Sequence, residues 1–278
     1  MNRAAEQGAR QEIIRFGRAM YERGYISASE GNLSARLGPG RILVTCSGVH
    51  KGFLTADQLM LVDDEGRPLG AGATGSRRLA PTSELPMHLE AYRRRPEIGA
   101  VIHAHPPHAI SLSIAGLSLA DCLLPEAIVL LGLIPTTAYA TPSSEENAAA
   151  IRALIGRHDA LVLQRHGALT VGTDLMEAFI RLEVVEQSAR IAFMLAQLGV
   201  RNPLEPAEVR KLLHLREQMG LARPGEAEAF CEACGVCHPA GEHTPLARPA
   251  LGPPSASPDP AAVRALVADL VHKALGEA

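Results

Sequence analysis

The chain of 278 residues has no tryptophan, and aromatic residues make up only 3% of it. A surface that stacks nucleic-acid bases needs aromatic side chains, so this scarcity argues against such a surface. The formal net charge of −3 is small, and it gives no broad positive field for nucleic acid or for an anionic membrane. We therefore expect neither nucleic acid nor a membrane as a partner.

Long apolar runs are missing as well. No stretch of about 18 uninterrupted apolar residues occurs, which argues against a membrane-spanning helix. Residues 1–11 are polar and charged, and they lack the apolar core of a signal peptide. Both absences predict a cytoplasmic protein. In that reducing compartment, we expect the five cysteines to be free thiols or metal ligands rather than disulfides.

The chain does contain a mixture of helical and strand patterns, with 47% hydrophobic residues to build a core. Apolar residues at helical spacing predict helices over residues 6–23, 83–92, 107–115 and 174–198. Short apolar runs predict strands over residues 41–45, 59–62, 100–103, 127–133 and 160–164, with a loop-rich stretch at 27–34. This mixture predicts an α/β or α+β layered domain over residues 1–222.

Two histidines, His103 and His105, lie one residue apart on a predicted strand. Residues i and i+2 of a strand point to the same side, so both imidazoles face one point. That arrangement suits a divalent metal with a third ligand from another element, for which His166 is the candidate. Three imidazoles and an open position describe a catalytic site, and the alternative is a pair of structural histidines.

Three short loops in the same half of the chain are rich in hydrogen-bond donors. Thr82, Ser83 and Glu84 precede a predicted helix, whose first N–H groups favour an anion. Two further loops, Gly31-Asn32 and Ser47-Gly48, let the backbone approach a phosphate closely. Each loop alone would be an ordinary turn, but together they indicate a phosphorylated small substrate.

Five short motifs follow one another along the chain. They are Gly31-Asn32-Leu33-Ser34, Thr45-Cys46-Ser47-Gly48, Pro81-Thr82-Ser83-Glu84 with His88, His103-Ala104-His105 and Gln164-Arg165-His166-Gly167. In this order they resemble the class II aldolase/adducin family over roughly residues 6–220, and most of all its fuculose-phosphate aldolase branch. The resemblance implies a three-layer α/β/α fold around a mixed, mainly antiparallel sheet, and a homotetramer with active sites at subunit interfaces.

The resemblance further implies a zinc enzyme that splits a ketose 1-phosphate into dihydroxyacetone phosphate and an aldehyde. L-fuculose or L-rhamnulose 1-phosphate would be the substrate, and lactaldehyde the aldehyde. His103, His105 and His166 would bind one Zn²⁺ per subunit, with Glu84 beside it as a further ligand and as the acid or base. The matching phosphate-binding residues are Gly31, Asn32, Ser47, Gly48, Thr82 and Ser83.

One departure from the fuculose-phosphate aldolases concerns a proton donor. They carry a tyrosine after the histidine strand, but residues 122–126 contain none, and Tyr139 matches a separate segment. Glu126 is a substitute donor or a structural carboxylate. A ribulose-5-phosphate 4-epimerase or a sugar-phosphate dehydratase therefore remains an alternative. An adducin-like scaffold without catalysis is a third, although the intact ligand set argues against it.

Four more histidines stay outside this ligand set. His88 lies one helical turn after Glu84 and is expected behind the metal ligands. His50, His108 and His158 are expected to be surface or structural residues.

A cysteine-rich segment, residues 223–238, follows the predicted domain. It holds Cys231, Cys234, Cys237 and His238, whose dense spacing predicts an accessory site for zinc or an iron–sulfur cluster. The alternative is a segment that is rich in cysteine without binding metal.

The end of the chain differs again. Residues 239–258 contain six prolines and are typical of an extended linker. Residues 259–278 carry one apolar stripe, which predicts an amphipathic helix. The helix either docks on its own domain or a neighbouring subunit, or resembles the encapsulation peptides of bacterial microcompartments. The second interpretation is favoured, because a microcompartment would sequester the reactive aldehyde product. It predicts a shell protein as a partner and a location inside the microcompartment.

Overall fold

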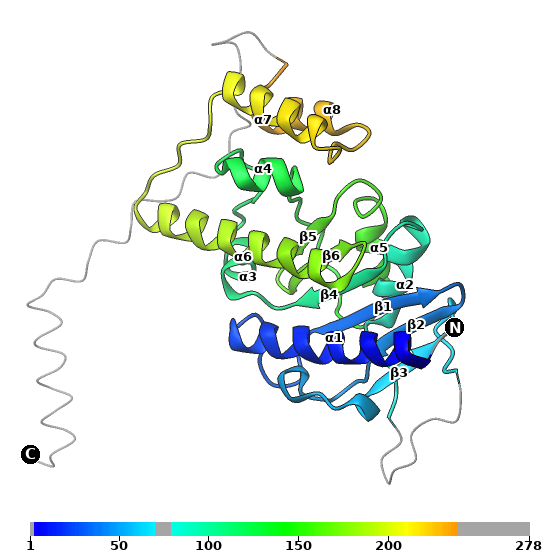
Figure 1. The fold of residues 1–278 in the computed structure, drawn as a ribbon. Helices are drawn as coiled ribbons and strands as arrows, with labels where there is room; N and C mark the ends of the chain where they lie inside the picture. The colour runs from blue at the N-terminus through cyan, green and yellow to red at the C-terminus, as the bar shows by residue number, and fades with distance from the viewer. Residues whose placement is uncertain (1–2, 70–78, 238–278) are drawn as a thin grey trace, which may run out of the picture.

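The computed structural model describes residues 3–69 and 79–237. A six-stranded sheet with the order β3-β2-β1-β4-β6-β5 forms its centre, and helices lie on both faces (Figure 1). All five pairs of neighbouring strands are antiparallel. The strands are β1 (Asn32–Gly38), β2 (Arg41–Thr45), β3 (Leu59–Val62), β4 (Ala100–Ala104), β5 (Ala160–Leu163) and β6 (Gly167–Gly172).

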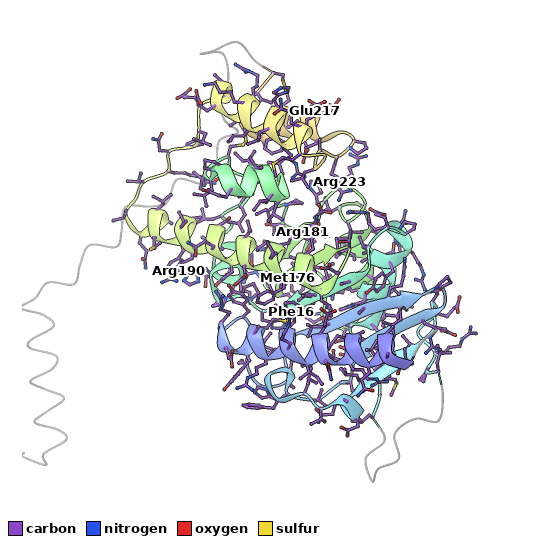
Figure 2. All side chains as sticks on the ribbon, in the orientation of Figure 1. Phe16, Met176, Arg181, Arg190, Glu217 and Arg223 are labelled. Carbon is purple, nitrogen blue, oxygen red and sulfur yellow. A yellow bond between two sulfur atoms is a disulfide. The ribbon has the colours of Figure 1, made fainter. Side chains whose placement is uncertain are left out.

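Helices α1 and α6 cover one face of the sheet, and α2 and α5 cover the other (Figure 1). Phe16 of α1 contacts Phe179 of α6, with ring centroids 5.2 Å apart, where these two helices lie side by side (Figure 2). The helices are α1 (Arg3–Glu22), α2 (Leu85–Arg94), α3 (Pro107–Ile114), α4 (Pro125–Leu131), α5 (Glu145–Arg152), α6 (Leu175–Gln197), α7 (Pro206–Gln218) and α8 (Glu226–Cys234), with short 3₁₀ turns η1 (Lys51–Phe53) and η2 (Ala56–Gln58).

Strand β4 shows why the sheet is covered on both sides. Ala100 and Ile102 belong to the apolar core under α1 and α6, whereas Val101 belongs to the core under α2 and α5. Successive side chains of a strand alternate between faces, so a continuous apolar run is what a sheet with two covered faces requires. The predicted three-layer α/β/α fold is confirmed.

Most predicted elements are present, but the strand predicted over residues 127–133 is wrong, because this segment is helix α4. Pro125 occupies the first turn of that helix, and Gly132 follows it with a φ of 72°. A short apolar run does not separate a buried strand from a buried helix. The stretch predicted as loop at 27–34 also proved partly wrong, since β1 begins at Asn32.

Helices α7 and α8 lie against α4, on the side of the molecule away from α1 (Figure 1). Phe230 of α8 and Val209 of α7 are fully buried in an apolar cluster with Ile128 of α4. The cysteine-rich segment 223–238 was predicted as a separate unit, and its residues up to 237 pack against this cluster.

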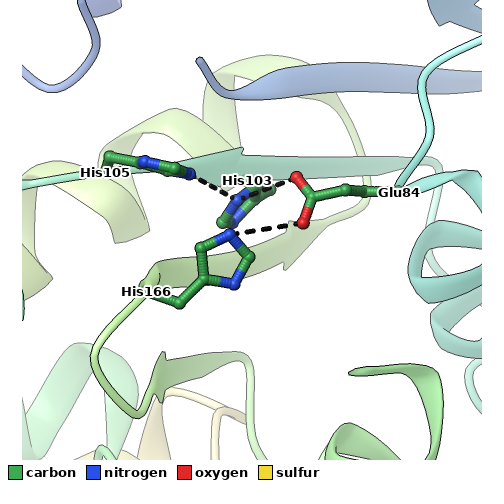
Figure 3. Close-up of side chains that lie close together, drawn as sticks. All are labelled: Glu84, His103, His105 and His166. Atoms are coloured by element: carbon green, nitrogen blue, oxygen red, sulfur yellow. Dashed lines mark hydrogen bonds and ion pairs between the residues drawn. The ribbon is translucent and has the colours of Figure 1, made fainter. Parts of the chain in front are cut away.

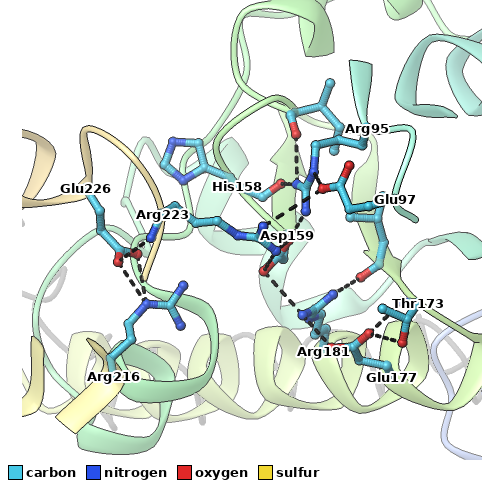
Figure 4. A network of polar contacts seen from close by, with 12 residues as sticks. Arg95, Glu97, His158, Asp159, Thr173, Glu177, Arg181, Arg216, Arg223 and Glu226 are labelled. Carbon is cyan, nitrogen blue, oxygen red and sulfur yellow. Dashed lines mark hydrogen bonds and ion pairs between the residues drawn. The ribbon is translucent and has the colours of Figure 1, made fainter. Parts of the chain in front are cut away.

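A polar network ties the same region to the sheet (Figure 4). The buried Asp159 accepts hydrogen bonds from Arg95 and Arg223, each at 2.8 Å, and pairs with Arg181 of α6 at 3.3 Å. Arg216 of α7 pairs with the carboxylate of Glu226 at 2.9 Å and also donates to a carbonyl of α4.

The expectation of reduced cysteines is contradicted, because the structure pairs four of them as the disulfides Cys122–Cys234 and Cys231–Cys237. Cys46 is a buried free thiol. Packing of α8 against the loop before α4 brings Cys122 next to a helix more than a hundred residues later in the chain, which local sequence could not indicate.

Some predictions fall on residues outside the described ranges. They concern His238, the linker 239–258 and the C-terminal helix 259–278. Within residues 3–69 and 79–237, no helix is both long and apolar enough to cross a bilayer.

Candidate metal centre and phosphate pocket

Three histidines and one glutamate converge at the C-terminal end of β4 (Figure 3). His103 is the fourth residue of β4, and His105 follows the end of that strand. His166 lies in the tight turn between β5 and β6, where Arg165 adopts a φ of 60°. Glu84 is the N-cap residue of α2 and enters from the opposite side. The structure thus brings together the four residues that the sequence singled out for metal binding.

The ligand atoms of these four residues lie within 4.8 Å of one another. Nε2 of His103 is 3.0 Å from Nε2 of His105 and 3.1 Å from Oε2 of Glu84. Nε2 of His166 is 3.3 Å from Oε1 of the same carboxylate. Separations of this size are those expected between neighbouring ligands of a tetrahedral zinc ion, whose bonds to nitrogen and oxygen are about 2.0–2.2 Å.

The hydrogen bonds of His103 leave its inner nitrogen free for a metal. Its Nδ1 donates to the carbonyl of Ala168 at 2.9 Å, so Nε2 presents a lone pair to the centre in the neutral ring. Burial and the other imidazoles lower the pKa of His105 to about 3, while burial and His103 lower that of His166 to about 4. Burial opposes protonation of His103, but the contact with Glu84 raises its pKa. Two neutral imidazoles, a third beside a carboxylate and the carboxylate itself form a donor set that suits a divalent cation, so the residues present fit a metal ion.

Glu84 is held in place by two asparagines. Asn32 of β1 donates to Oε2 at 2.9 Å, and Asn147 of α5 donates to Oε1 at 3.3 Å. Burial alone would raise the pKa of Glu84, but His103, His166 and these hydrogen bonds hold it well below its usual range. The carboxylate is therefore ionised at neutral pH.

Behind Asn32 runs a chain of buried hydrogen bonds. His88 Nε2 contacts Asn32 Oδ1, and His88 Nδ1 is 2.7 Å from the hydroxyl of Ser34, which in turn is 2.9 Å from the hydroxyl of Tyr92. Because Asn32 gives its amide hydrogen to Glu84, its oxygen must accept, so His88 donates from Nε2. Burial lowers the pKa of His88 to about 3, and the neutral ring then accepts at Nδ1 from Ser34. His88 thus lies behind the ligands, as predicted.

Two glycines let the elements of the centre approach one another. A Cβ on Gly31, whose φ is +67°, would lie 2.7 Å from the side chain of Ile26 and 3.0 Å from the carbonyl of His103. A Cβ on Gly167 would lie 2.2 Å from the carbonyl of Ala104. Side chains at either position would push the histidine strand away from its neighbours.

A pocket with an empty volume of about 670 Å³, including its open mouth, adjoins the centre. The six residues predicted to bind phosphate all line it. An isolated β-bridge between Cys46 and Pro81 places the Ser47-Gly48 loop beside the loop that holds Thr82 and Ser83. The lining residues are Ser29, Glu30, Gly31, Asn32, Ser47, Gly48, Lys51, Thr82, Ser83, Glu84, His105, Pro142, Ser143 and His166.

Lys51 is the one lysine among these lining residues, and the sequence reasoning missed it. This residue is 2% exposed, and its Nζ donates to the carbonyl of Ser29 at 2.5 Å. Burial lowers its pKa to about 8, against an opposing effect from Glu84. The signal was available, since Lys51 follows the Ser47-Gly48 loop by three residues.

Asn147 and Ser143 were also missed, and no sequence signal pointed to them. Ser143 has a φ of 60°, and its hydroxyl is 2.8 Å from that of Ser83. Both residues come from the segment around the start of α5, which reaches the pocket only through packing of α5 on α2.

The remaining candidates lie elsewhere. Glu126 is exposed in the first turn of α4, and Tyr139 is 63% exposed. His50 caps η1, His108 pairs with Glu186 at 2.7 Å, and His158 bonds to the carbonyl of Leu133. Their structural contacts agree with the expectation for these three histidines.

The fold and the site together are those of a metal-dependent α/β enzyme. Comparison with known proteins identifies the family. Residues 11–193 match the family described as Class II Aldolase and Adducin N-terminal domain. The chain belongs to the class II aldolase/adducin family, and its His/Glu metal site is that of a sugar-phosphate enzyme.

Relatives with two different activities are similar to this chain. A 3-oxo-tetronate 4-phosphate decarboxylase of Pectobacterium atrosepticum is 31% identical over 71% of this chain and 89% of its own length. An L-fuculose phosphate aldolase of Methanococcus maripaludis is 33% identical over 67% of this chain and 97% of its own. The crystal structure of L-fuculose-1-phosphate aldolase from Thermus thermophilus is 31% identical, with a TM-score of 0.60 over 73% of this chain and all of that one.

Proposed function

We propose that this protein is an aldolase that cleaves a deoxyketose 1-phosphate, L-fuculose or L-rhamnulose 1-phosphate, into dihydroxyacetone phosphate and lactaldehyde. The position of Glu84 carries this proposal. Its carboxylate contacts His103 and His166, and it directly follows Thr82 and Ser83 of the phosphate pocket. A group that moves protons therefore lies between the metal ligands and the anchor for the substrate's phosphate.

The pocket supports binding of a phosphate dianion at one end. Thr82 and Ser83 offer hydroxyls at the start of α2, where the helix dipole favours negative charge. Lys51 adds a positive charge with little competition from water, since it is buried. With the phosphate anchored there, the carbon chain of the substrate would extend toward His105 and Glu84, which line the same pocket.

A divalent ion held by His103, His105 and His166 would supply Lewis-acid stabilisation of negative charge on the substrate oxygens. Glu84 is ionised at neutral pH and acts first as a base. It takes the proton from the hydroxyl on the carbon that becomes the aldehyde. The carbon–carbon bond breaks, and its electron pair stays on the ketone fragment as an enediolate. Glu84 then gives the proton to the carbon of this ketone fragment that carried the broken bond.

Decarboxylation of a 3-oxo sugar-acid phosphate is a second candidate, favoured by a specific observation. No tyrosine lies among the described residues that line the pocket. Carbon dioxide leaves without needing a proton, so a single acid–base group such as Glu84 suffices for that reaction. A relative named as a 3-oxo-tetronate 4-phosphate decarboxylase is similar to the chain over most of its length.

Substrate assays separate these reactions. The zinc-loaded protein is incubated with L-fuculose 1-phosphate, L-rhamnulose 1-phosphate, 3-oxo-tetronate 4-phosphate and ribulose 5-phosphate. Release of dihydroxyacetone phosphate from a ketose 1-phosphate, abolished in Glu84→Gln, supports the aldolase. Release of carbon dioxide and dihydroxyacetone phosphate from 3-oxo-tetronate 4-phosphate, with neither ketose 1-phosphate cleaved, supports the decarboxylase. Epimerised ribulose 5-phosphate without any cleavage contradicts both.

A further inference from the structure

We propose that Cys122, Cys231, Cys234 and Cys237, when reduced, form a second metal site with four thiolate ligands. The site lies between α8 and the loop before α4, apart from the histidine centre. It replaces the predicted set that included His238, because Cys122 supplies the fourth sulfur. The proposal is independent of which sugar phosphate the histidine centre cleaves.

Helix α8 brings three of the sulfurs to one place. Cys231 and Cys234 are three residues apart, so they lie on the same face of α8, one turn from each other. The helix ends at Gly235, whose φ is 65°, and the chain then turns back. As a result, the Cα atom of Cys237 comes within 5.2 Å of that of Cys231.

The fourth sulfur comes from a remote part of the chain. The Cα atoms of Cys122 and Cys234 are 6.2 Å apart. Three cysteines at C-x₂-C-x₂-C spacing are typical of 4Fe–4S clusters, in which a fourth, separate cysteine completes the set of four. The tertiary structure adds that separate cysteine to the sequence motif, which points to an iron–sulfur cluster. A zinc ion bound by four cysteines is the alternative that the metal analysis distinguishes.

The surroundings of the four cysteines suit a bound metal. Phe230, Val236 and Ile128 share an apolar cluster with Cys122, and Cys231 and Cys234 pack against it. Arg210 donates to the carbonyl of Val236 at 2.6 Å, which places a positive charge near a site that would be negative. Cys237 is exposed, so reductant and metal can reach the site.

The two disulfides differ in the length of the loop that each one closes. The Cys122–Cys234 bridge joins residues 112 apart and closes a long loop, whereas Cys231–Cys237 joins residues only 6 apart. The short loop restricts the unfolded chain about half as much by its loop-closure entropy, so the second bridge stabilises the fold less than the first. A four-thiolate site gives all four cysteines one common purpose.

Conversion between the two forms needs a reductant. Each disulfide takes up two electrons and two protons from a dithiol such as a reduced thioredoxin-type protein, which itself becomes a disulfide. The four resulting thiols lose their protons when they bind the metal. Metal binding would then hold α8 against α4 as the disulfides do.

The test is anaerobic purification of the full chain from iron-supplemented cells, followed by measurement of iron, acid-labile sulfide and zinc per chain. We expect iron and sulfide with visible absorption near that of 4Fe–4S proteins, or zinc beyond the amount held by the histidine centre. Cys122→Ser and the exposed-site variant Cys237→Ser should each lower this metal more than tenfold. Cys46→Ser, at the buried free thiol, should leave it unchanged.

Two results would overturn the proposal. One is a chain purified this way that shows a single reactive thiol, two intact disulfides and no metal beyond the histidine centre. The other is metal content that stays the same in both Cys122→Ser and Cys237→Ser. The sugar-phosphate cleavage assay is run on the same samples. It distinguishes the cysteine site from the histidine centre, since loss of the cysteine-bound metal should leave cleavage unchanged.

Discussion

Asn32 links Glu84 to the interior of the protein: its Nδ2 donates to Glu84 Oε2 at 2.9 Å, while its Oδ1 accepts a hydrogen bond from His88. Asn32 also faces His103 across the β1–β4 pair. One buried amide thus fixes both the orientation of the carboxylate and its distance from the metal ligands. The role predicted for Asn32, phosphate binding, stays a prediction, because both ends of its amide are occupied by these partners.

Replacing Asn32 by leucine should impair catalysis by releasing Glu84. Loss of a residue that orients a metal-site group typically costs about 10–100-fold in activity or metal affinity. We expect kcat to fall within that range with KM changed less, measured by steady-state kinetics at saturating zinc. Asn202→Leu, at an exposed loop position, is the matched control. Unchanged kcat in Asn32→Leu would contradict the positioning role.

Substrate binding should depend on pH through Lys51. Burial lowers its pKa to about 8, so in the free protein the ammonium is lost as the pH rises through that value. We expect KM for the phosphorylated substrate to rise above about pH 8. Lys51→Arg should keep its charge and flatten this rise, and Lys51→Met should raise KM at every pH. A pH profile shared by all three proteins would exclude Lys51 as the cause.

The same group affects stability in a defined direction. Its folded-state pKa lies below the ordinary value of 10.5, so the unfolded chain binds more protons between about pH 8 and 10.5. The stability of the natural protein relative to Lys51→Met should therefore increase with pH across that window. Urea unfolding of both proteins at pH 7.5 and 10 measures the difference.

Removal of the metal should abolish cleavage. We expect dialysis against a chelator to reduce activity more than about 100-fold, with recovery on adding zinc, because the three imidazoles and Glu84 would hold the ion that the proposed reaction needs. His103→Ala should show the same loss without recovery. His214→Ala, in which the imidazole is exposed on α7, serves as the control. Activity that survives in metal-free protein would rule out the proposed chemistry.

Asp159 should matter for stability rather than for catalysis. Asp159→Ala removes the buried carboxylate that Arg95 and Arg181 share, although Arg95 keeps Glu97 and Arg181 keeps Glu177 as partners. We therefore expect a loss of stability below the about 3–5 kcal/mol that a fully unpaired buried charge costs. Burial opposes ionisation of Asp159, but the arginines lower its pKa, so its contribution is present above about pH 4 and is lost as the pH falls. Urea unfolding at pH 7 and pH 3.5 tests both points. Asp63→Ala, whose partner Arg67 is exposed, should change stability little.

The predicted C-terminal helix should be dispensable for the reaction. Deletion of residues 259–278 is expected to leave kcat and KM unchanged and to abolish co-purification with microcompartment shell proteins. A chain in which a glycine–serine segment of the same length replaces residues 259–278 controls for altered length. Collapse of activity on deletion would instead indicate a helix that docks on the catalytic domain.

Local patterns predicted much of the fold. The strands at 41–45 and 59–62 and the long helix ending near residue 198 follow from apolar periodicity, which a short window of sequence contains. The failure at 127–133 has the same origin: six apolar residues and one glycine fit a buried helix as well as a buried strand, and only packing against α7 decides between them.

The sequence by itself determined that His103 and His105 point to one place, because alternation along a strand needs no distant partner. Motif order added Glu84 and His166. Only the tertiary structure decided that Asn147 holds Glu84, that Lys51 faces the phosphate pocket and that Cys122 meets the cysteines of α8. The contacts of Asn147 and Cys122 join residues more than 60 positions apart, and Lys51 reaches a carbonyl 22 positions away. Such proximity arises from how the elements pack on the sheet rather than from any local pattern.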